Sequence, residues 1–257
     1  MELFDSHCHL DDEQFSADRP EAIDRMRAAG VTRCLCPGSD LASSRAALVL
    51  AEAYPFIYAA AGVHPHEAEK APTDYLEQLE ALLANPRVRA LGEIGLDFHY
   101  DFSPRDVQER VMDAQVALAL RLDRPVIFHI REAHGEMTDY FHSLPRKPRG
   151  VIHCFSGSAE TARDYLRMGF YISFAGPLTF KKAPHLWEAA AAVPMNRLLV
   201  ETDSPYMAPD PLRGRRNEPA NVRLVLEKLA QLKGVTAEEM AAATVQNAMD
   251  VYEIREE

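Results

Sequence analysis

Asp5-Ser6-His7-Cys8-His9-Leu10 follows the short apolar run Leu3-Phe4 near the start of this 257-residue chain. If that run is a strand, side chains alternate between its two faces, so His7 and His9 point one way and Cys8 points the other. A lone histidine at such a place more often caps or packs. Two imidazoles on one face are instead half of a metal site when further ligands follow downstream, and in this chain they do.

Apolar, β-branched runs recur along the whole chain, with helical patterns between them. The predicted strands are residues 3–5, 31–36, 56–63, 88–94, 125–130, 151–155, 170–174 and 198–201. Alternation of strand and helix implies a parallel sheet. Eight strands that are nearly all apolar on both faces fit a closed (β/α)8 TIM barrel better than an open sheet. No low-complexity linker and no internal repeat divides the chain, so we expect one domain over residues 1–257.

Cap signals predict where several helices begin and end. A helix over residues 19–29 is expected to stop at Gly30, and Ser103 is the expected N-cap of a long helix that has Pro104 in its first turn. A helix over residues 219–233 is expected to stop at Gly234. The last helix begins at Thr236, whose hydroxyl forms a capping box with Glu239.

The composition is ordinary for a globular protein, with 47% hydrophobic and 26% charged residues. The chain contains no run of about 18 apolar residues, the length that could span a bilayer. Its N-terminus lacks the basic-then-apolar pattern of a signal peptide, so we expect a cytoplasmic protein. The formal net charge of -11 argues against a broad basic surface that coats duplex DNA. Any contact with nucleic acid must therefore be local.

The four cysteines, Cys8, Cys34, Cys36 and Cys154, do not resemble a disulfide framework in a chain of this length. Cys34 and Cys36 would share one face of a strand. Without a second such pair, that spacing is only a weak zinc signal. We expect these cysteines to be small buried apolar side chains.

Metal-ligand residue types stand at the ends of several predicted strands. Glu93 closes the fourth strand, His129 the fifth and His153 the sixth, while Asp203 follows the eighth. The carboxyl ends of barrel strands converge on one mouth, so these four residues are expected to meet His7 and His9 there. Each one alone could be a hydrogen-bonded core histidine or a capping acid, but together they predict a site.

Six ligands are too many for one tetrahedral ion but suit two divalent ions that share a carboxylate. We assign His7, His9 and Asp203 to one ion and His129 and His153 to the other. Glu93 bridges them, and an activated hydroxide lies between. Imidazole-rich ligation suits Zn, Mn, Co or Ni better than Mg, although availability in the cell can override that preference.

The same residues resemble, block by block and in order, the TatD family of metal-dependent hydrolases. The matching blocks lie at residues 5–10, 62–66, 92–97, 129–131, 153–157, 201–206 and 216–219. The resemblance implies a barrel of the amidohydrolase type, a requirement for divalent metal, the same six ligands and deoxyribonuclease activity, often exonucleolytic from a 3′ end. Many relatives carry Gly-Lys-Arg where this chain has Gly214-Arg215-Arg216, and an Arg in place of Lys changes the geometry of a phosphate contact.

Charge at the predicted site supports phosphodiester chemistry. Two divalent cations bring +4 and Glu93 with Asp203 returns -2, which leaves about +2 before substrate binds. Asp203 is the candidate general base. The residues expected around the ions are His64, Arg131 and Arg216 as contacts to the substrate, and Glu201 either as a substrate contact or as a carboxylate that orients a ligand histidine.

Two other functions remain open from the sequence. An amide or ester hydrolase would use the same activated hydroxide, although several amidases bridge their metals with a carboxylated lysine after strand four, where this chain has Glu93. A barrel that binds a ligand without turnover is the other alternative. We expect DNA or other nucleic-acid ends as substrate, no membrane association, and a monomer without an obligate protein partner.

Overall fold

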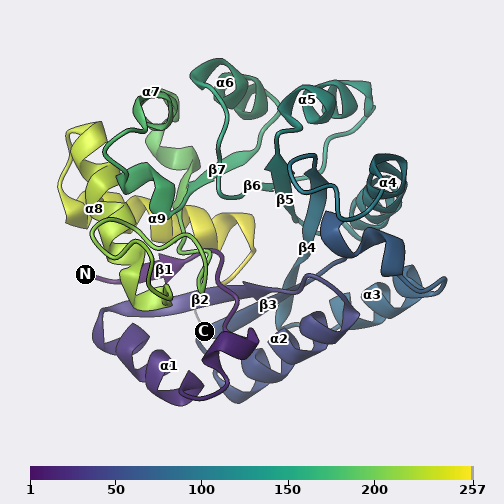
Figure 1. The fold of residues 1–257 in the computed structure, drawn as a ribbon, viewed down its shortest axis with the longest axis horizontal. Helices are drawn as coiled ribbons and strands as arrows, with labels where there is room; N and C mark the ends of the chain where they lie inside the picture. The colour runs from purple at the N-terminus through teal and green to yellow at the C-terminus, as the bar shows by residue number, and fades with distance from the viewer. Residues whose placement is uncertain (256–257) are drawn as a thin grey trace.

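Eight parallel strands form one sheet in the order β1 to β8 in the computed structural model, which describes residues 1–255 (Figure 1). The strands are β1 (Leu3–Asp5), β2 (Val31–Pro37), β3 (Ile57–Ala61), β4 (Val88–Asp97), β5 (Val126–Arg131), β6 (Gly150–Ile152), β7 (Tyr171–Phe174) and β8 (Leu198–Val200). The Ser6 amide just after β1 donates to the Val200 carbonyl at 3.1 Å and brings the first and last strands together. The predicted (β/α)8 barrel is confirmed.

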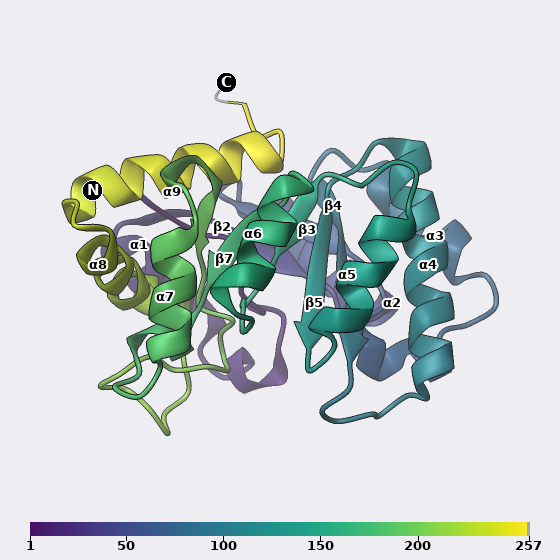
Figure 2. The ribbon, with the colours of Figure 1, turned by 90° about the horizontal axis from the view of Figure 1, so that it is seen from above.

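Helices follow the strands and cover the outside of the barrel (Figure 1). They are α1 (Arg19–Ala28), α2 (Leu41–Ala53), α3 (Tyr75–Leu83), α4 (Arg105–Leu122), α5 (His134–Ser143), α6 (Ala159–Arg167), α7 (Pro184–Ala192), α8 (Val222–Lys233) and α9 (Ala237–Val251). Figure 2 shows α9 lying across one end of the barrel, while the arrowhead of β5 points to the opposite end. Within residues 1–255, none of these helices combines the length and the apolar character needed to cross a bilayer.

Two apolar clusters are separated by the wall of strands. The larger cluster fills the layer between the strands and the surrounding helices. The smaller one lies inside the barrel, where Phe4, Leu35, Tyr58, Ala60, Ala90, Ile127, Val151 and Leu199 meet residues at the end of α9 and just beyond it, namely Ala248, Met249, Val251, Tyr252 and Ile254. We call this interior cluster the floor of the barrel. It closes the end opposite to the carboxyl ends of the strands.

Several element ends differ from the prediction. Strand β4 runs on to Asp97, because Leu96 and Asp97 still pair with β5, and β6 stops at Ile152 instead of residue 155. The predicted N-cap Ser103 is wrong: Pro104 holds that position, and the Ser103 hydroxyl instead donates to the His66 carbonyl at 3.1 Å.

The later helices follow their cap signals more closely. Helix α8 begins at Val222 because Pro219–Asn221 forms a separate turn of 3-10 helix. Gly234 ends α8 in a left-handed conformation, with φ of 67°. The predicted capping box is confirmed, since the Thr236 hydroxyl accepts from the Glu239 amide and the Glu239 carboxylate accepts from the Thr236 amide.

Candidate metal centre

The loops that follow β1 and β8 are tied together at the mouth of the barrel by a buried carboxylate. Asp5 accepts from the Thr202 amide at 2.9 Å and from its hydroxyl at 2.6 Å. The Asp203 amide donates to the His7 carbonyl at 2.9 Å, and the His9 amide donates to the Ser204 carbonyl at 2.7 Å. These backbone links bring together His7 and Asp203, which are nearly 200 positions apart in the sequence, so that their side chains face the same space.

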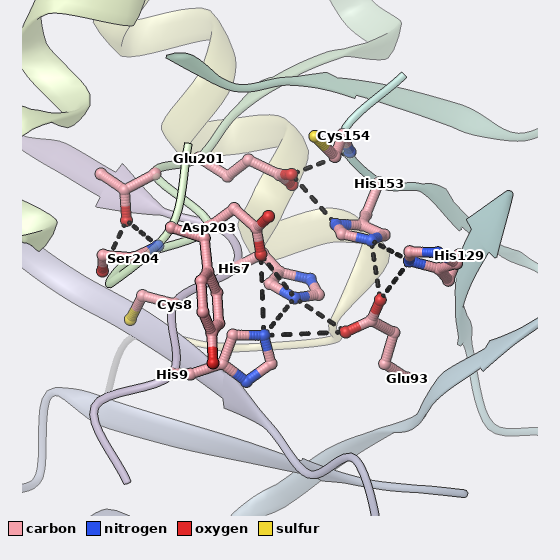
Figure 3. Close-up of polar contacts among 12 residues, drawn as sticks. His7, Cys8, His9, Glu93, His129, His153, Cys154, Glu201, Asp203 and Ser204 are labelled. Atoms are coloured by element: carbon pink, nitrogen blue, oxygen red, sulfur yellow. Dashed lines mark hydrogen bonds and ion pairs between the residues drawn. The ribbon is translucent and has the colours of Figure 1, made fainter. Parts of the chain in front are cut away.

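Glu93 lies between two groups of histidines and presents one carboxylate oxygen to each group (Figure 3). Its Oε2 is 3.2 Å from His7 Nε2 and 3.7 Å from His9 Nε2. Its Oε1 is 2.7 Å from His129 Nδ1 and 2.8 Å from His153 Nε2. A carboxylate divided in this way has the arrangement needed to bridge two cations.

Asp203 completes the first group. Its Oδ1 is 3.6 Å from Nε2 of both His7 and His9. Those two nitrogens are 3.1 Å apart, and the facing nitrogens of His129 and His153 are 3.2 Å apart. Ring nitrogens that converge on one another and on carboxylate oxygens form a suitable set of donors for a cation. Cys8 points away from this space, as the alternation of side chains after β1 predicts (Figure 3).

Two further carboxylates determine which ring nitrogen of each histidine faces the centre. Glu201 Oε1 accepts from the Cys154 amide at 2.8 Å and lies 3.1 Å from His153 Nδ1, which leaves His153 Nε2 facing Glu93. Asp97 Oδ2 lies 3.1 Å from His129 Nε2, which leaves His129 Nδ1 facing Glu93. A carboxylate behind the far nitrogen of a ligand histidine fixes its tautomer and raises its basicity.

His64 also lies beside Glu93, but its hydrogen bonds fit a role other than that of a metal ligand. Its Nδ1 accepts from the His66 amide at 3.1 Å, so in the neutral ring the proton is on Nε2, which lies 3.3 Å from Glu93 Oε1. Burial and the charge of His129 lower the pKa of His64 to about 4. His64 is therefore a neutral hydrogen-bond donor at the edge of the centre. His64, the predicted substrate contact, thus lies beside Glu93 at the mouth of the barrel.

The buried carboxylates create a strong demand for positive charge. Burial opposes protonation of His9, but its hydrogen bond to Asp203 and the charge of Glu93 outweigh that cost and raise its pKa to about 10. Burial likewise opposes protonation of His153, and Glu93 and Glu201 overcome it and raise its pKa well above the usual range. In the protein alone, protonated histidines balance the negative charge of these carboxylates. Divalent cations would balance it by replacing those protons.

The donor set fits metal ions in further respects. His7, His9 and Glu93 offer atoms within 4.8 Å of one another, as do His7, His153 and Asp203, and also His64, Glu93 and His129. All six predicted ligands thus contribute to one continuous polar cluster.

A cavity of ≈ 200 Å³ opens beside the cluster, and His129, His153 and Asp203 form part of its lining. The rest of the lining is mostly apolar and includes Ile130, Phe155, Phe174, Ala175, Pro177, Leu178, Leu186 and Met207. Arg131 also lines it, and no ion pair engages the Arg131 guanidinium among residues 1–255. An unpaired guanidinium beside the centre is available to an anionic substrate.

Arg216, the other arginine predicted to contact the substrate, is already engaged. Its Nη1 and Nη2 pair with the two carboxylate oxygens of Asp18 at 2.6 and 2.8 Å, and its guanidinium lies 4.6 Å from the centre of the Phe15 ring. The structure therefore gives Arg216 a role in joining the loop after β8 to the segment before α1. The sequence did not show this pairing, because it joins two loops far apart in the chain.

The cysteines agree in large part with the prediction. Cys8, Cys34 and Cys36 are buried in the apolar layer outside the barrel, with Cys8 Sγ 3.9 Å from Cys36 Sγ, and Cys154 is partly exposed. All four are free. The residue that the sequence reasoning missed is Asp97, which is fully buried and joins His129 to His66. Its position four residues after Glu93 on the same strand, and hence on the same face, was the available signal.

Comparison with known proteins gives consistent matches over nearly the whole chain. The family model described as TatD related DNase matches residues 4–253. A relative called an uncharacterized metal-dependent hydrolase, YabD of Bacillus subtilis, is 42% identical over 98% of this chain and 99% of its own length. The 3'-5' ssDNA/RNA exonuclease TatD of Pantoea vagans is 38% identical over 98% of this chain and all of its own. The crystal structure of YjjV, a TatD homologue from Escherichia coli, superposes with a TM-score of 0.92 at 36% identity and covers 98% of both chains.

Proposed function

Because this chain belongs to the family of TatD related DNases and is a metal-dependent hydrolase, we propose that it cleaves phosphodiester bonds of DNA from a 3′ end. A relative that is 38% identical over its whole length is named as a 3'-5' exonuclease of single-stranded DNA and RNA. The proposed substrates are therefore nucleic-acid ends. Amides and esters are the second candidate class of substrate.

The observation that carries the proposal is the division of the Glu93 carboxylate between two histidine groups. With Oε2 toward His7 and His9 and Oε1 toward His129 and His153, we propose that Glu93 bridges two divalent cations. Asp203 joins the first group, as its equal distances of 3.6 Å to His7 and His9 suggest. When bound, such ions lower the pKa of a water and polarise the phosphoryl group.

The protein's own residues handle the protons and the phosphate. Burial opposes ionisation of Asp203, but its hydrogen bond to His9 and the nearby positive histidines lower its pKa, so its carboxylate is ionised and can accept a proton from the attacking water. His64 holds a proton on Nε2 and can donate a hydrogen bond to the phosphate or to the leaving oxygen. The Arg131 guanidinium, which no ion pair engages among residues 1–255, binds the phosphate, and the neighbouring cavity gives room for the adjoining nucleoside.

The ligand atoms favour some divalent ions over others. Histidine nitrogens outnumber carboxylate oxygens, which favours Zn, Mn, Co or Ni over Mg.

We also propose that residues 1–257 act as one domain and as a monomer, as predicted from the sequence. The continuous eight-stranded sheet supports the proposal of one domain. The cytoplasmic location stays a prediction.

The test is hydrolysis of an end-labelled single-stranded oligonucleotide by metal-stripped protein to which Mg, Mn, Co or Zn is added back. We expect a ladder that starts at the 3′ end and appears only with metal. The Asp203→Asn variant should give no ladder while it keeps its fold. If every metal leaves the oligonucleotide intact and the same protein hydrolyses an amide or ester, the proposal is wrong and the second-ranked function takes its place.

A further inference from the structure

Exposed aromatic side chains are confined to the mouth of the barrel. Among residues 1–255, the large apolar side chains that are exposed are Met1, Val49, Tyr100, Phe102 and Tyr206. The three aromatic ones all contact histidines of the metal centre or of its surroundings. Aromatic surface left in water at one place on a protein marks a binding site more often than chance exposure.

Tyr100 and Phe102 lie in the loop between β4 and α4 and stack on each other, with ring centres 5.0 Å apart and planes 10° from parallel. We call these two residues the aromatic pair. Phe102 is 63% exposed and Tyr100 is 46% exposed. Both rings lie nearly perpendicular to the His66 ring, with its centre 5.5 Å from that of Tyr100 and 4.8 Å from that of Phe102. The pair is thus preorganised: Tyr100 lies between Phe102 and the Arg131 guanidinium, and Phe102 is the more exposed ring.

A short chain of contacts joins the aromatic pair to the centre. His66 Nε2 lies 2.8 Å from Asp97 Oδ2, and the same oxygen lies 3.1 Å from His129 Nε2. The Arg131 guanidinium lies 4.6 Å from the centre of the Tyr100 ring and also lines the cavity beside the centre. A phosphate bound by Arg131 would therefore have the aromatic pair beside it.

Tyr206 borders the other histidine group. Its ring is 6.2 Å from the ring of His9 and nearly perpendicular to it, and its hydroxyl donates to Asp12 Oδ2 at 2.7 Å. Tyr206 is 49% exposed. Aromatic faces therefore stand on two sides of Glu93, one beyond His129 and the other beyond His9.

From this arrangement we infer that the aromatic pair and Tyr206 stack the bases on either side of the phosphate that is cleaved, and thereby select single-stranded substrate. The inference rests on the proposed function and adds to it the residues that read the strand. A base within a duplex is already stacked and paired, so its face is closed to a protein ring. An unpaired base can stack on an aromatic side chain, and every base has such a face, so the selection is for single strands and not for sequence.

Charge favours a nucleic-acid occupant over a protein partner for this surface. Arg131 is beside the aromatic pair, and two bound cations would add +4 to a centre whose carboxylate ligands Glu93 and Asp203 carry -2. A strand of phosphates with unpaired bases matches a cationic centre flanked by aromatic rings. Docking of an apolar protein segment onto the pair is the alternative that the test below separates.

The test compares binding of two single-stranded oligonucleotides of equal length, one of thymidine and one of abasic residues with the same phosphates. Binding is measured by fluorescence anisotropy on Mn-loaded Asp203→Asn protein, in which turnover is prevented. We expect the thymidine strand to bind about 10-fold more tightly than the abasic strand. Phe102→Ala and Tyr206→Ala should each bring that ratio down toward one. Tyr206→Phe should keep it, because the ring remains and only the hydrogen bond to Asp12 is lost.

The matched control is Val49→Ala, which removes an exposed apolar side chain from α2 and should leave the ratio unchanged. An unchanged ratio in Phe102→Ala and Tyr206→Ala would overturn the inference, and the aromatic pair would then be a surface for another kind of partner. Failure of the proposed function has a separate signature. If the ratio responds to the aromatic variants but wild-type protein hydrolyses neither strand with any metal, stacking stands and the nuclease assignment falls.

Discussion

The two ends of one barrel interior differ sharply in chemistry, although the same strands build both. On β5, Ile127 lies in the floor and His129 lies at the mouth; on β6, Val151 lies in the floor and His153 follows at the mouth. In each case a step of two residues keeps the side chain on the same face and moves it toward the carboxyl end. The same strands therefore contribute apolar packing at one end of the barrel and the candidate metal ligands at the other.

The difference also concerns how each end is stabilised. The floor is mainly apolar, and the Tyr252 hydroxyl within it donates to the Ser6 carbonyl at 3.3 Å. The mouth holds the buried carboxylate of Glu93, whose charge is balanced by protonated histidines or by cations. Burying charges costs free energy that their mutual attraction offsets only when the pairing is good. Changes at the floor should therefore reduce stability, and changes at the mouth should reduce metal binding and rate.

The largest effect is expected from Glu93→Gln, which keeps the size of the side chain and removes its charge. Glu93 faces both histidine groups, so we expect loss of one or both metals and a fall in kcat on the order of 1000-fold or more. Metal content by mass spectrometry and turnover on an end-labelled oligonucleotide check this. Thermal unfolding of the metal-free variant checks that it remains folded, and unchanged metal content would refute the bridge.

The next largest effect is expected at the floor, from Leu35→Ala. Leu35 is fully buried on β2 within the interior cluster, so truncation should lower the free energy of unfolding by about 2–5 kcal/mol. Denaturant unfolding measures this, with Leu35→Met as the control that keeps volume and costs less than about 1.5 kcal/mol. The folded protein should still bind its full complement of metal. A loss of metal without a loss of stability would mean that the two ends are not independent.

A smaller effect is expected from Glu201→Gln, which tests the support behind a ligand. Glu201 accepts from the Cys154 amide and faces His153 Nδ1, so its loss should weaken metal affinity by about 10- to 100-fold. Activity measured against metal concentration should shift to higher concentration and recover at saturation. Activity that stays low at saturating metal would assign Glu201 a direct part in the reaction instead.

The smallest effect is expected from His134, the first residue of α5. Burial lowers its pKa from 6.5 to about 4, so below pH 6.5 the unfolded chain binds a proton that the folded protein does not. The free energy of unfolding is therefore unaffected by this proton above pH 6.5. It decreases as the pH falls toward 4, by on the order of 1 kcal/mol for this half-buried group. His134→Gln should flatten the stability of the protein over that range. An identical pH profile in the variant would exclude His134 as the cause.

Much of the mouth was predictable from the sequence, because a period of two along each strand carries the argument. Once Ile127 and Val151 are recognised as interior, His129 and His153 must face the same interior one step later. The same reasoning could have added Asp97, four residues beyond Glu93. The barrel itself follows from eight apolar strands in alternation with helices.

Other features depend on the paths of loops, which no periodicity encodes. The pairing of Arg216 with Asp18 joins segments almost 200 residues apart, and the sequence alone placed Arg216 with the substrate. Tyr100 and Tyr206 are exposed whereas Phe98 and Phe155 are buried, a difference that residue type and position near a strand end do not predict. The division of the Glu93 oxygens between two groups depends on four side chains from other strands and loops, which only the folded chain brings together.

The most direct test of the central claim is a titration of metal-free protein with Mn²⁺, with bound metal and hydrolysis of a single-stranded oligonucleotide measured at each step. Two ions bridged by Glu93 predict that activity rises until two equivalents are bound for each chain and then levels off. In Glu93→Gln the same titration should bind fewer ions and give almost no activity. Full activity with one bound ion, or metal binding that is the same in wild type and Glu93→Gln, would contradict the account.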